Sequence, residues 1–592
     1  MRSQESVVAA VGTPPHDTAQ RAAAWLSGAA TDRRWLDLAH EMLFQLVEVD
    51  TTPKPQAREC AAAEDACFAV VERWLAGAAP ALESERRPIR TDAIAAHPYF
   101  SRPYYLADLP ADPTDAARAG YAGRVNLTAH LPGAGPRLVF NAHIDTVPPH
   151  IAPRRDGDVL HGRGSADDKG GVAAMVLAAA LLEQVRERFG VVPSCDLRLQ
   201  FVIDEETGGN GSLSMTHEPD QTCDAVVVLE CTDLQPHPAN RGAVWYRMEL
   251  SAPESDPGNG AREAKPNLLE AAAFAVGSME EEGRTLRAES SHDMFPQRPV
   301  QTCHGMLGRF GTHPSRVHDF VALRLTWVGI SHSLLVDEVE AALADYIAAY
   351  GDKSIPGEGD ALLERHLAWR NVGMDEAMLD VFGLSGHMGA TLRLDGAITK
   401  AAWIVRHLSR VARAKGGPWA SLRCDLEGGT PGELVLEGGQ GFVPTHELPE
   451  VTARLSAAAR RGVECFEHDT GLARGSVRLT MGYEKLHNAA FSRRPDSAAM
   501  RAMTAALDAA GAPLRGAIAG WTVSCDARIF AERYPQADVV TFGPGALSVA
   551  HSGEERTDLH DVLRAAVALA HLALNFGREA TSDSTSEGAH RP

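Results

Sequence analysis

The chain has 592 residues, 44% of them hydrophobic and 23% charged, which is the composition of an ordinary soluble globular protein. This length exceeds what one hydrophobic core supports, so we expect at least two domains. The formal net charge of −21 argues against nucleic acid or an anionic membrane as the partner, because both favour clustered Lys and Arg.

Nine cysteines are scattered along the chain without a Cys-x-x-Cys pair, which is typical of reduced thiols in the cytoplasm. The first residues lack the apolar core of a signal peptide, and no apolar run reaches the roughly 18 residues that span a membrane. We therefore expect a cytoplasmic protein without a membrane segment.

The order of the predicted elements indicates an α/β fold, a mixed sheet flanked by helices, into which an α+β domain is inserted. Residues 1–18 and 577–592 are small and polar, and we expect them to be disordered tails. Residues 19–240 and 481–576 form the two parts of the α/β domain. Between them, residues 241–480 contain segments that alternate in polarity like antiparallel strands exposed on one side, with helical stretches between these segments.

The spacing of apolar residues predicts individual elements in chain order. Helices are expected over 35–49, 57–78, 171–187, 336–350, 448–461, 496–510 and 559–576. Strands are expected over 125–131, 137–145, 197–203, 225–230, 245–250, 319–327, 390–394, 432–436 and 537–542. The strand at 137–145 begins as an apolar, β-branched and aromatic run bounded by Pro136 and Pro148, which is typical of a buried strand of an α/β sheet.

Polar residues follow this buried strand directly. His143 and Asp145 are two positions apart, so they emerge on the same face at the carboxyl end of the strand, where open α/β sheets bind ligands. Asp167 lies on the Gly- and Asp-rich turn before the next helix. Taken alone, it could be a helix N-cap, and a lone buried His could be a core residue.

Two more strands also end in acids. Asp204-Glu205-Glu206 follows one strand and Glu230 ends the next. The acidic run could be a solvated turn, but three such strand ends and a helix-entry Asp form a convergent cluster. Imidazoles and carboxylates without thiolates favour Zn, Mn or Co. One His and one acid per ion with a shared Asp indicates a two-metal centre, in which one further acid is needed to move the proton.

These motifs resemble the dizinc metallopeptidase family 20, which includes aminoacylase, carboxypeptidase G, acetylornithine deacetylase, succinyl-diaminopimelate desuccinylase and dizinc dipeptidases. The motifs that carry the resemblance are His143-x-Asp145, Gly162-Arg-Gly-x-x-Asp167-x-Lys-Gly, Glu205-Glu206-x-Gly, Glu230 and Ala550-His551-Ser. The resemblance implies a zinc-exopeptidase-like catalytic domain with an inserted lid domain, and it extends over about 33–240 and 482–576.

The resemblance also implies roles for these residues. Asp167 would bridge two divalent metal ions, which the resemblance implies to be zinc, with cobalt or manganese as alternatives. His143 and Glu230 would hold one ion, and Glu206 and His551 the other. Glu205 would be the general base, and Asp145 would hydrogen-bond the other nitrogen of His143 and fix its tautomer.

The lid resembles the family less closely. Gly386-His387-Met-Gly-Ala resembles the lid segment that carries a His, so His387 is the candidate that contacts the tetrahedral oxyanion, or else a structural hydrogen-bonding residue. Arg528, in Asp526-Ala-Arg528, could bind a substrate carboxylate or form a structural salt bridge.

The implied activity is hydrolysis of the amide bond of a dipeptide, short peptide or N-acyl amino acid. Glu at position 230 favours a deacylase or desuccinylase, whereas the large lid favours a dipeptidase. An inactive metal-binding regulatory paralogue is the alternative from another class, but retention of Glu205 argues against it. We expect a monomer, or a homodimer that forms through the lid.

Overall fold

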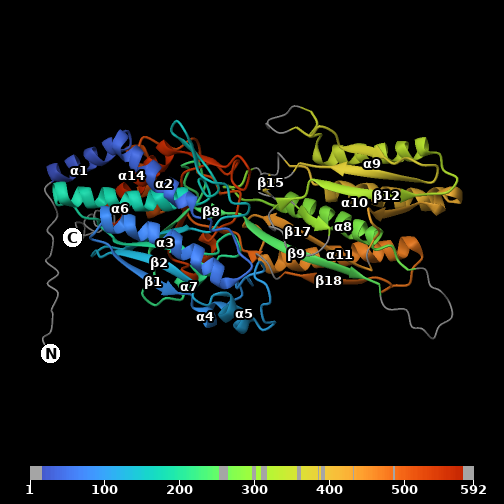
Figure 1. Cartoon of the computed structure of the whole chain (residues 1–592), viewed down its shortest axis with the longest axis horizontal. Helices are drawn as coiled ribbons and strands as arrows, with labels where there is room; N and C mark the ends of the chain where they lie inside the picture. The colour runs from blue at the N-terminus through green and yellow to red at the C-terminus, as the bar shows by residue number, and fades with distance from the viewer. Residues whose placement is uncertain are drawn as a thin grey trace, which may run out of the picture.

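The computed structural model describes residues 16–252, 265–296, 302–307, 316–355, 362–384, 386–387, 394–430, 432–483 and 487–577. Figure 1 shows two halves side by side along the longest axis. One half contains the first and the last elements of the chain, and the other contains the elements between them. The chain therefore leaves the first half, builds the second, and returns.

A six-stranded mixed sheet forms the centre of the first half. Its strands lie in the order β1 (Glu83–Pro88), β2 (Val125–Leu131), β6 (Asp196–Val202), β3 (Arg137–His143), β7 (Ala225–Leu229), β21 (Asp538–Phe542). The last four run parallel, and the first two pair antiparallel at one edge. The residues of β6 and β7 are all buried, and β7 is a continuous apolar strand, as expected for strands covered on both faces.

Helices cover both faces of this sheet, because alternate residues of each strand point in opposite directions. Leu138 and Phe140 of β3 join the larger core, whereas Val139 joins a smaller core on the other face. The larger core is covered by α1 (His16–Ala29), α2 (Arg33–Glu48), α3 (Ala57–Ala78), α6 (Lys169–Phe189), α12 (Ala498–Ala509) and α14 (Leu559–Asn575). The smaller core includes residues of α13 (Ala527–Arg533). The helix α6 is buried from Lys169 to Glu183.

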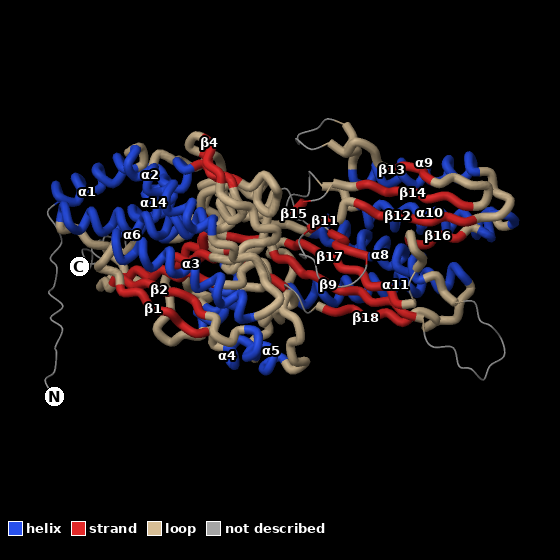
Figure 2. The backbone as a smooth tube through the Cα atoms, viewed as in Figure 1, coloured by secondary structure: helices blue, strands red, loops and turns tan. Residues whose placement is uncertain are grey.

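In its described residues, the second half contains two larger antiparallel sheets and several long helices around a core of its own (Figure 2). One sheet consists of β10 (Thr302–Leu307), β17 (Glu433–Phe442), β9 (Gly242–Ser251), β18 (Arg478–Gly482) and β19 (His487–Asn488). The other consists of β13 (Leu367–Arg370), β14 (Glu376–Phe382), β12 (Phe320–Thr326) and β16 (Arg423–Leu426). The helices are α8 (Leu268–Glu289), α9 (His332–Tyr350), α10 (Ala397–Lys415) and α11 (Leu448–Thr470).

The predicted α/β fold with an inserted α+β lid is confirmed, and the boundaries differ in detail. The lid sheet continues to Asn488, beyond the predicted limit at 480, because β18 and β19 both pair with β9. Helix α1 begins at His16, inside the predicted tail of 1–18. The predicted strand at 390–394 lies outside the described residues except for residue 394. Among the helices of the described ranges, none is both long and apolar enough to cross a membrane.

Candidate metal centre

The candidate site lies at the carboxyl ends of the parallel strands. His143 is the last residue of β3, Glu206 follows β6 after a short turn, and Glu230 comes directly after β7. Because parallel strands end at the same edge of a sheet, these side chains converge there. All three are buried.

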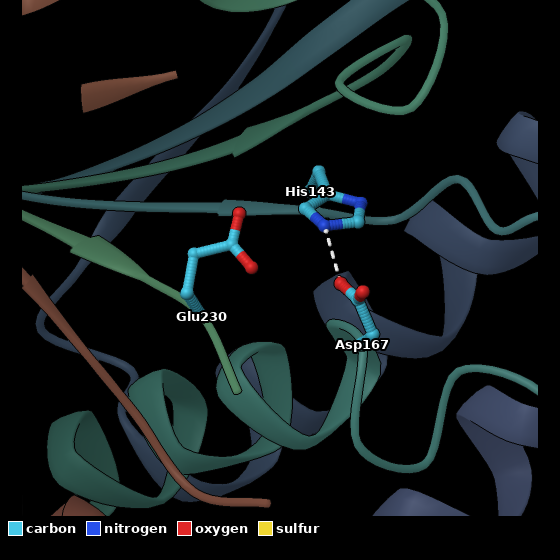
Figure 3. A group of neighbouring side chains, drawn as sticks. All are labelled: His143, Asp167 and Glu230. Carbon is cyan, nitrogen blue, oxygen red and sulfur yellow. Dashed lines mark hydrogen bonds and ion pairs between the residues drawn. The ribbon is translucent and has the colours of Figure 1, made fainter. Parts of the chain in front are cut away.

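The fourth group, Asp167, is carried by the loop that enters α6. This loop contains Gly162 and Gly164 at φ values of 145° and 91°, which L-residues rarely adopt. The tight turn places the Asp167 carboxylate beside His143, with Nε2 of His143 3.1 Å from Oδ1 of Asp167 (Figure 3).

His551 approaches from the C-terminal segment, in a left-handed conformation with φ of 58°. Its Nε2 atom lies 2.9 Å from Oε1 of Glu206 and 3.2 Å from Oδ2 of Asp167. The two oxygens of Asp167 therefore face two different imidazoles.

Two sets of donor atoms result. His143, Asp167 and Glu230 form one set, and Asp167, Glu206 and His551 form the other, each with its ligand atoms within 4.8 Å of one another. Figure 3 shows the first set, with Glu230 and Asp167 approaching His143 from two sides. All five residues predicted as metal ligands are thus brought together, and Asp167 belongs to both sets.

The charges of the site show that this donor set fits divalent cations. Burial raises the pKa of Glu230 well above its usual value, and the charge of Asp167 raises it further. Burial likewise raises the pKa of Glu205, together with the charges of Asp526 and Glu206. Cations between these carboxylates would stabilise their ionised forms, and two imidazoles with carboxylates are the ligands of Zn, Mn or Co.

Burial acts in the opposite direction on the two imidazoles, but the neighbouring carboxylates raise their pKa values. Burial opposes protonation of His551, but the charge of Glu206 and the hydrogen bond with Asp167 raise its pKa to about 10. Burial also opposes protonation of His143, where hydrogen bonds with Asp145 and Asp167 raise the pKa well above its ordinary value. Protons and metal ions therefore compete for the same nitrogen atoms.

Asp145 and Glu205 lie beside the ligands and belong to neither set. The Nδ1 atom of His143 lies 3.0 Å from the backbone oxygen of Asp145 and 3.5 Å from its Oδ1. The two carboxylate oxygens of Asp145 accept hydrogen bonds from the backbone N–H groups of Glu205 and Glu206, at 3.1 Å each. Asp145 therefore contacts both His143 and the turn 204–206.

A buried ion-pair network fixes the turn 204–206. Arg124 donates to Asp204 at 2.6 Å and to Glu64 of α3 at 3.0 Å, and all three side chains are almost fully buried. Tyr121 and Tyr105 donate to the same Asp204 carboxylate at 2.6 and 2.8 Å. Asp204 itself has a φ of 61°, so the network fixes a backbone conformation that non-glycine residues rarely adopt.

Glu555 holds the Asp167 loop in a similar way. One carboxylate oxygen accepts from the backbone N–H groups of Gly164, Ala166 and Asp167 at 2.9 to 3.1 Å, and the other contacts Arg163. The pairing of β22 (Arg556–Asp558) with β5 (Val159–His161) fixes Glu555 at this loop.

No role was predicted from the sequence for Glu555, Arg163, Arg124 or Glu64. Their partners are far away in the chain, 392 residues apart for Arg163 and Glu555 and 60 for Arg124 and Glu64. The only local signals were the Arg between two glycines and the acid four positions after His551.

The remaining two predicted residues are Arg528 and His387. Arg528 is buried, donates to the backbone oxygen of Gly208 at 3.0 Å, and packs over the ring of Tyr99. It is not among the residues that line the cavity beside the ligands. The backbone of His387 forms β15 (Gly386–His387) with β11 (Arg316–Val317), and its side chain lies outside the described residues.

A small cavity of about 40 Å³ opens onto the two donor sets. Besides the acids and His551, it is lined by Arg241 and by two tryptophans, Trp245 and Trp521. Asp167 is shared by the two sets, each set has one imidazole, and Glu205 lies in the cavity outside both sets. This arrangement defines the site of a metal-dependent hydrolase.

The family follows from the sequence. The model of peptidase family M20/M25/M40 matches residues 139–575, well over half of the chain. The chain belongs to this family of metallopeptidases, and the predicted resemblance is confirmed. The match includes all the predicted metal ligands and begins after Glu64, Tyr105 and Arg124.

Similar proteins agree with this assignment. A probable carboxypeptidase of Aspergillus terreus is 38% identical over 149 residues, which are 23% of this chain and 32% of that protein. A probable carboxypeptidase of Ajellomyces dermatitidis is 40% identical over 100 residues, 15% of this chain and 22% of that protein. These matches therefore span about a third or less of the curated relatives.

Two solved structures share the fold over their whole length. Human carnosine dipeptidase 1 aligns with a TM-score of 0.52 and 13% identity, covering 96% of this chain and 100% of that one. The dipeptidase Dug1p of Saccharomyces cerevisiae aligns with a TM-score of 0.52 and 10% identity, covering 95% and 99%.

Proposed function

We propose that the protein hydrolyses the amide bond of a dipeptide, short peptide or N-acyl amino acid. The observation that carries the proposal is the position of Asp167, which belongs to two donor sets and has Glu205 nearby in the same cavity. Two divalent cations held there, zinc or else cobalt or manganese, supply Lewis acidity to a scissile carbonyl and lower the pKa of water.

The residues of the chain supply the proton transfers. Glu205 takes a proton from the attacking water and gives it to the departing amine, which is the work of a general base that then acts as an acid. Its raised pKa, caused by burial and by neighbouring acids, favours holding that proton between the two steps. Asp145 keeps Glu205 in place by accepting its backbone N–H.

Arg241 is the group we assign to the substrate carboxylate. It lines the cavity beside the donor sets, whereas Arg528 contacts the backbone behind the turn. A guanidinium in this position suits a carboxylate by charge and by hydrogen-bond geometry. A substrate with a free carboxylate agrees with the names of the similar proteins, which are carboxypeptidases and dipeptidases.

The test is release of amine from a panel of dipeptides and N-acyl amino acids. The protein is stripped with a chelator and then assayed alone and after addition of zinc, cobalt or manganese. Hydrolysis of at least one class that disappears on stripping and returns with metal is expected. Metal uptake without turnover on any substrate would instead favour a binding or regulatory paralogue.

A further inference from the structure

The cavity at the donor sets is too small for a whole substrate. Its volume of about 40 Å³ equals roughly three water molecules, whereas pockets for small ligands measure about 300–1,000 Å³. Only the scissile group and its immediate neighbours fit there. Most of a dipeptide or N-acyl amino acid must lie outside it.

A second cavity of about 720 Å³ lies between the two halves of the molecule. One wall is the segment 100–113, which leads into α5 (Pro113–Gly120), and the other includes Arg247 of the lid strand β9. Figure 2 shows α5 and the loops around it at the side of the first half that faces β9. The lining is mainly apolar, with Phe100, Pro103, Tyr104, Leu106 and Leu109.

Strand β9 connects this cavity with the donor sets. Trp245 lines the small cavity and Arg247 lines the large one. Residues two positions apart on a strand share a face and are about 7 Å apart, so the two cavities adjoin along one face of the lid sheet. From the other wall, the ring of Tyr104 lies close enough for the charges of Glu206 and Asp145 to act on its hydroxyl.

Three charged side chains line the large cavity: Arg102 and Arg247 contact the protein itself, and Asp108 is exposed. Arg102 donates to the backbone oxygens of Leu109 and Ala111, and Arg247 pairs with Glu249 at 2.7 Å. The other seven lining residues are aromatic, aliphatic or proline, and a surface that is mainly of this kind suits an apolar group.

We propose that the large cavity binds the acyl group, or the N-terminal side chain, of the substrate, and that this group is apolar and larger than acetyl. The inference rests on the proposed function, in which Arg241 holds the carboxylate at the opposite end. Arg241, Trp245 and Arg247 follow one another along the chain, so a substrate that extends along β9 meets them in that order. Hydrolysis adds water to the amide and releases a bulky carboxylic acid and an amino acid.

The experiment compares N-acetyl and N-benzoyl derivatives of the same amino acids in the metal-loaded protein. Ala111 lines the large cavity and is exposed, so Ala111→Trp fills the cavity without disturbing the core. Ala107 is exposed in the same segment and is outside the lining, so Ala107→Trp is the matched control.

We expect the wild-type kcat/KM to be at least about 10-fold higher for the benzoyl substrates, the gain that burial of one aromatic ring provides. Ala111→Trp removes this gain and leaves the acetyl substrates within about 2-fold, a difference small against the effect of ring burial. Ala107→Trp behaves like wild type. Equal effects of Ala111→Trp on both substrate classes, or none on either, would overturn the proposal.

Binding distinguishes failure of this inference from failure of the proposed function. Calorimetry of N-benzoylglycine with the Glu205→Gln variant measures affinity without turnover. If adding Ala111→Trp to this variant weakens binding, the large cavity is supported as the site even if no substrate is hydrolysed. Binding that Ala111→Trp leaves unchanged overturns the inference even if hydrolysis is observed.

Discussion

At the scale of single residues, position relative to the two donor sets distinguishes the candidate metal ligands from Glu205, the proposed general base. Glu205 and Glu206 are neighbours in the chain, yet only Glu206 belongs to a donor set. The backbone of both is fixed by the same carboxylate, that of Asp145. Replacement of one therefore tests a different function from replacement of the other.

Glu205→Gln should lower kcat by about 10²–10⁴-fold, the usual cost of losing general acid–base catalysis. The amide keeps the size of the side chain but does not accept the proton. Metal content, measured by atomic emission on the purified protein, should stay at the wild-type value. A variant that retains more than about a tenth of the wild-type rate would show that another group carries the proton.

A second residue-scale prediction concerns His571 of α14. Burial lowers its pKa to about 4, and its ring contacts Ser27 Oγ at 3.1 Å. The unfolded chain takes up this proton at its ordinary pKa near 6.5, before the folded chain does, so stability falls as the pH is lowered from 6.5 towards 4. The loss amounts to about 3 kcal/mol.

His571→Gln should flatten this part of the stability profile, because Gln does not titrate. The measurement is urea unfolding of wild type and variant between pH 4 and 7. The exposed His468→Gln serves as control and should follow the wild-type curve. An unchanged slope in His571→Gln would assign the acid sensitivity to other groups.

At the scale of elements, two buried carboxylates attach loops to the scaffold. Glu555, just before β22, holds the loop that carries Asp167, and Asp204 attaches the turn 204–206 to Arg124 and α3. Neither contact was predictable from the sequence, since local patterns do not show pairing over such separations. His143, Asp167, Glu206 and Glu230 were predictable because each follows an apolar strand or precedes a helix, whereas His551 was assigned only through the family motif Ala550-His551-Ser.

Glu555→Gln should weaken metal binding by about 10–100-fold, the usual effect of losing a group that orients a ligand. The amide weakens the contacts with three N–H groups and with Arg163 while keeping the volume. Titration with a chromophoric chelator measures the affinity directly. Glu554→Gln, next to it but exposed, is the control and should bind metal like wild type.

Arg124→Met should cost about 3–5 kcal/mol of unfolding free energy, because it leaves two buried carboxylates without their cation. Arg118→Met removes an exposed ion pair with Asp92 and should cost less than about 1 kcal/mol. Denaturant unfolding of both variants gives the comparison. Similar losses in the two variants would contradict the role given to the buried network.

The bounds of helices and strands were likewise predictable where the local sequence sets them and not where tertiary pairing sets them. The helix at 57–78 and the strand at 125–131 were predicted with the bounds that the structure has. Helix α8 was missed, since its Ala-rich sequence carries a weak periodic signal. The lid limit at 480 was misplaced because β18 and β19 are edge segments whose pairing with β9 is a tertiary property.

At the scale of the whole molecule, the donor sets join remote parts of the chain. His143 and His551 lie on segments separated by the whole lid, and both contact Asp167. Bound metal therefore links the two parts of the α/β domain.

Removal of metal should lower the melting temperature by several degrees. Ligands that bind only the folded state add about 4 kcal/mol at a free concentration 1,000 times the Kd. Differential scanning calorimetry before and after dialysis against chelator measures the change, and zinc should restore it. Identical curves would show that metal contributes nothing to the connection between the two segments.

The late position of His551 in the chain has a consequence for synthesis. While the polypeptide grows on the ribosome, every ligand up to Glu230 emerges early, but the last one follows only after more than 300 further residues. Nascent chains and truncated fragments that stop before His551 therefore lack one of the two imidazoles and have an incomplete second donor set.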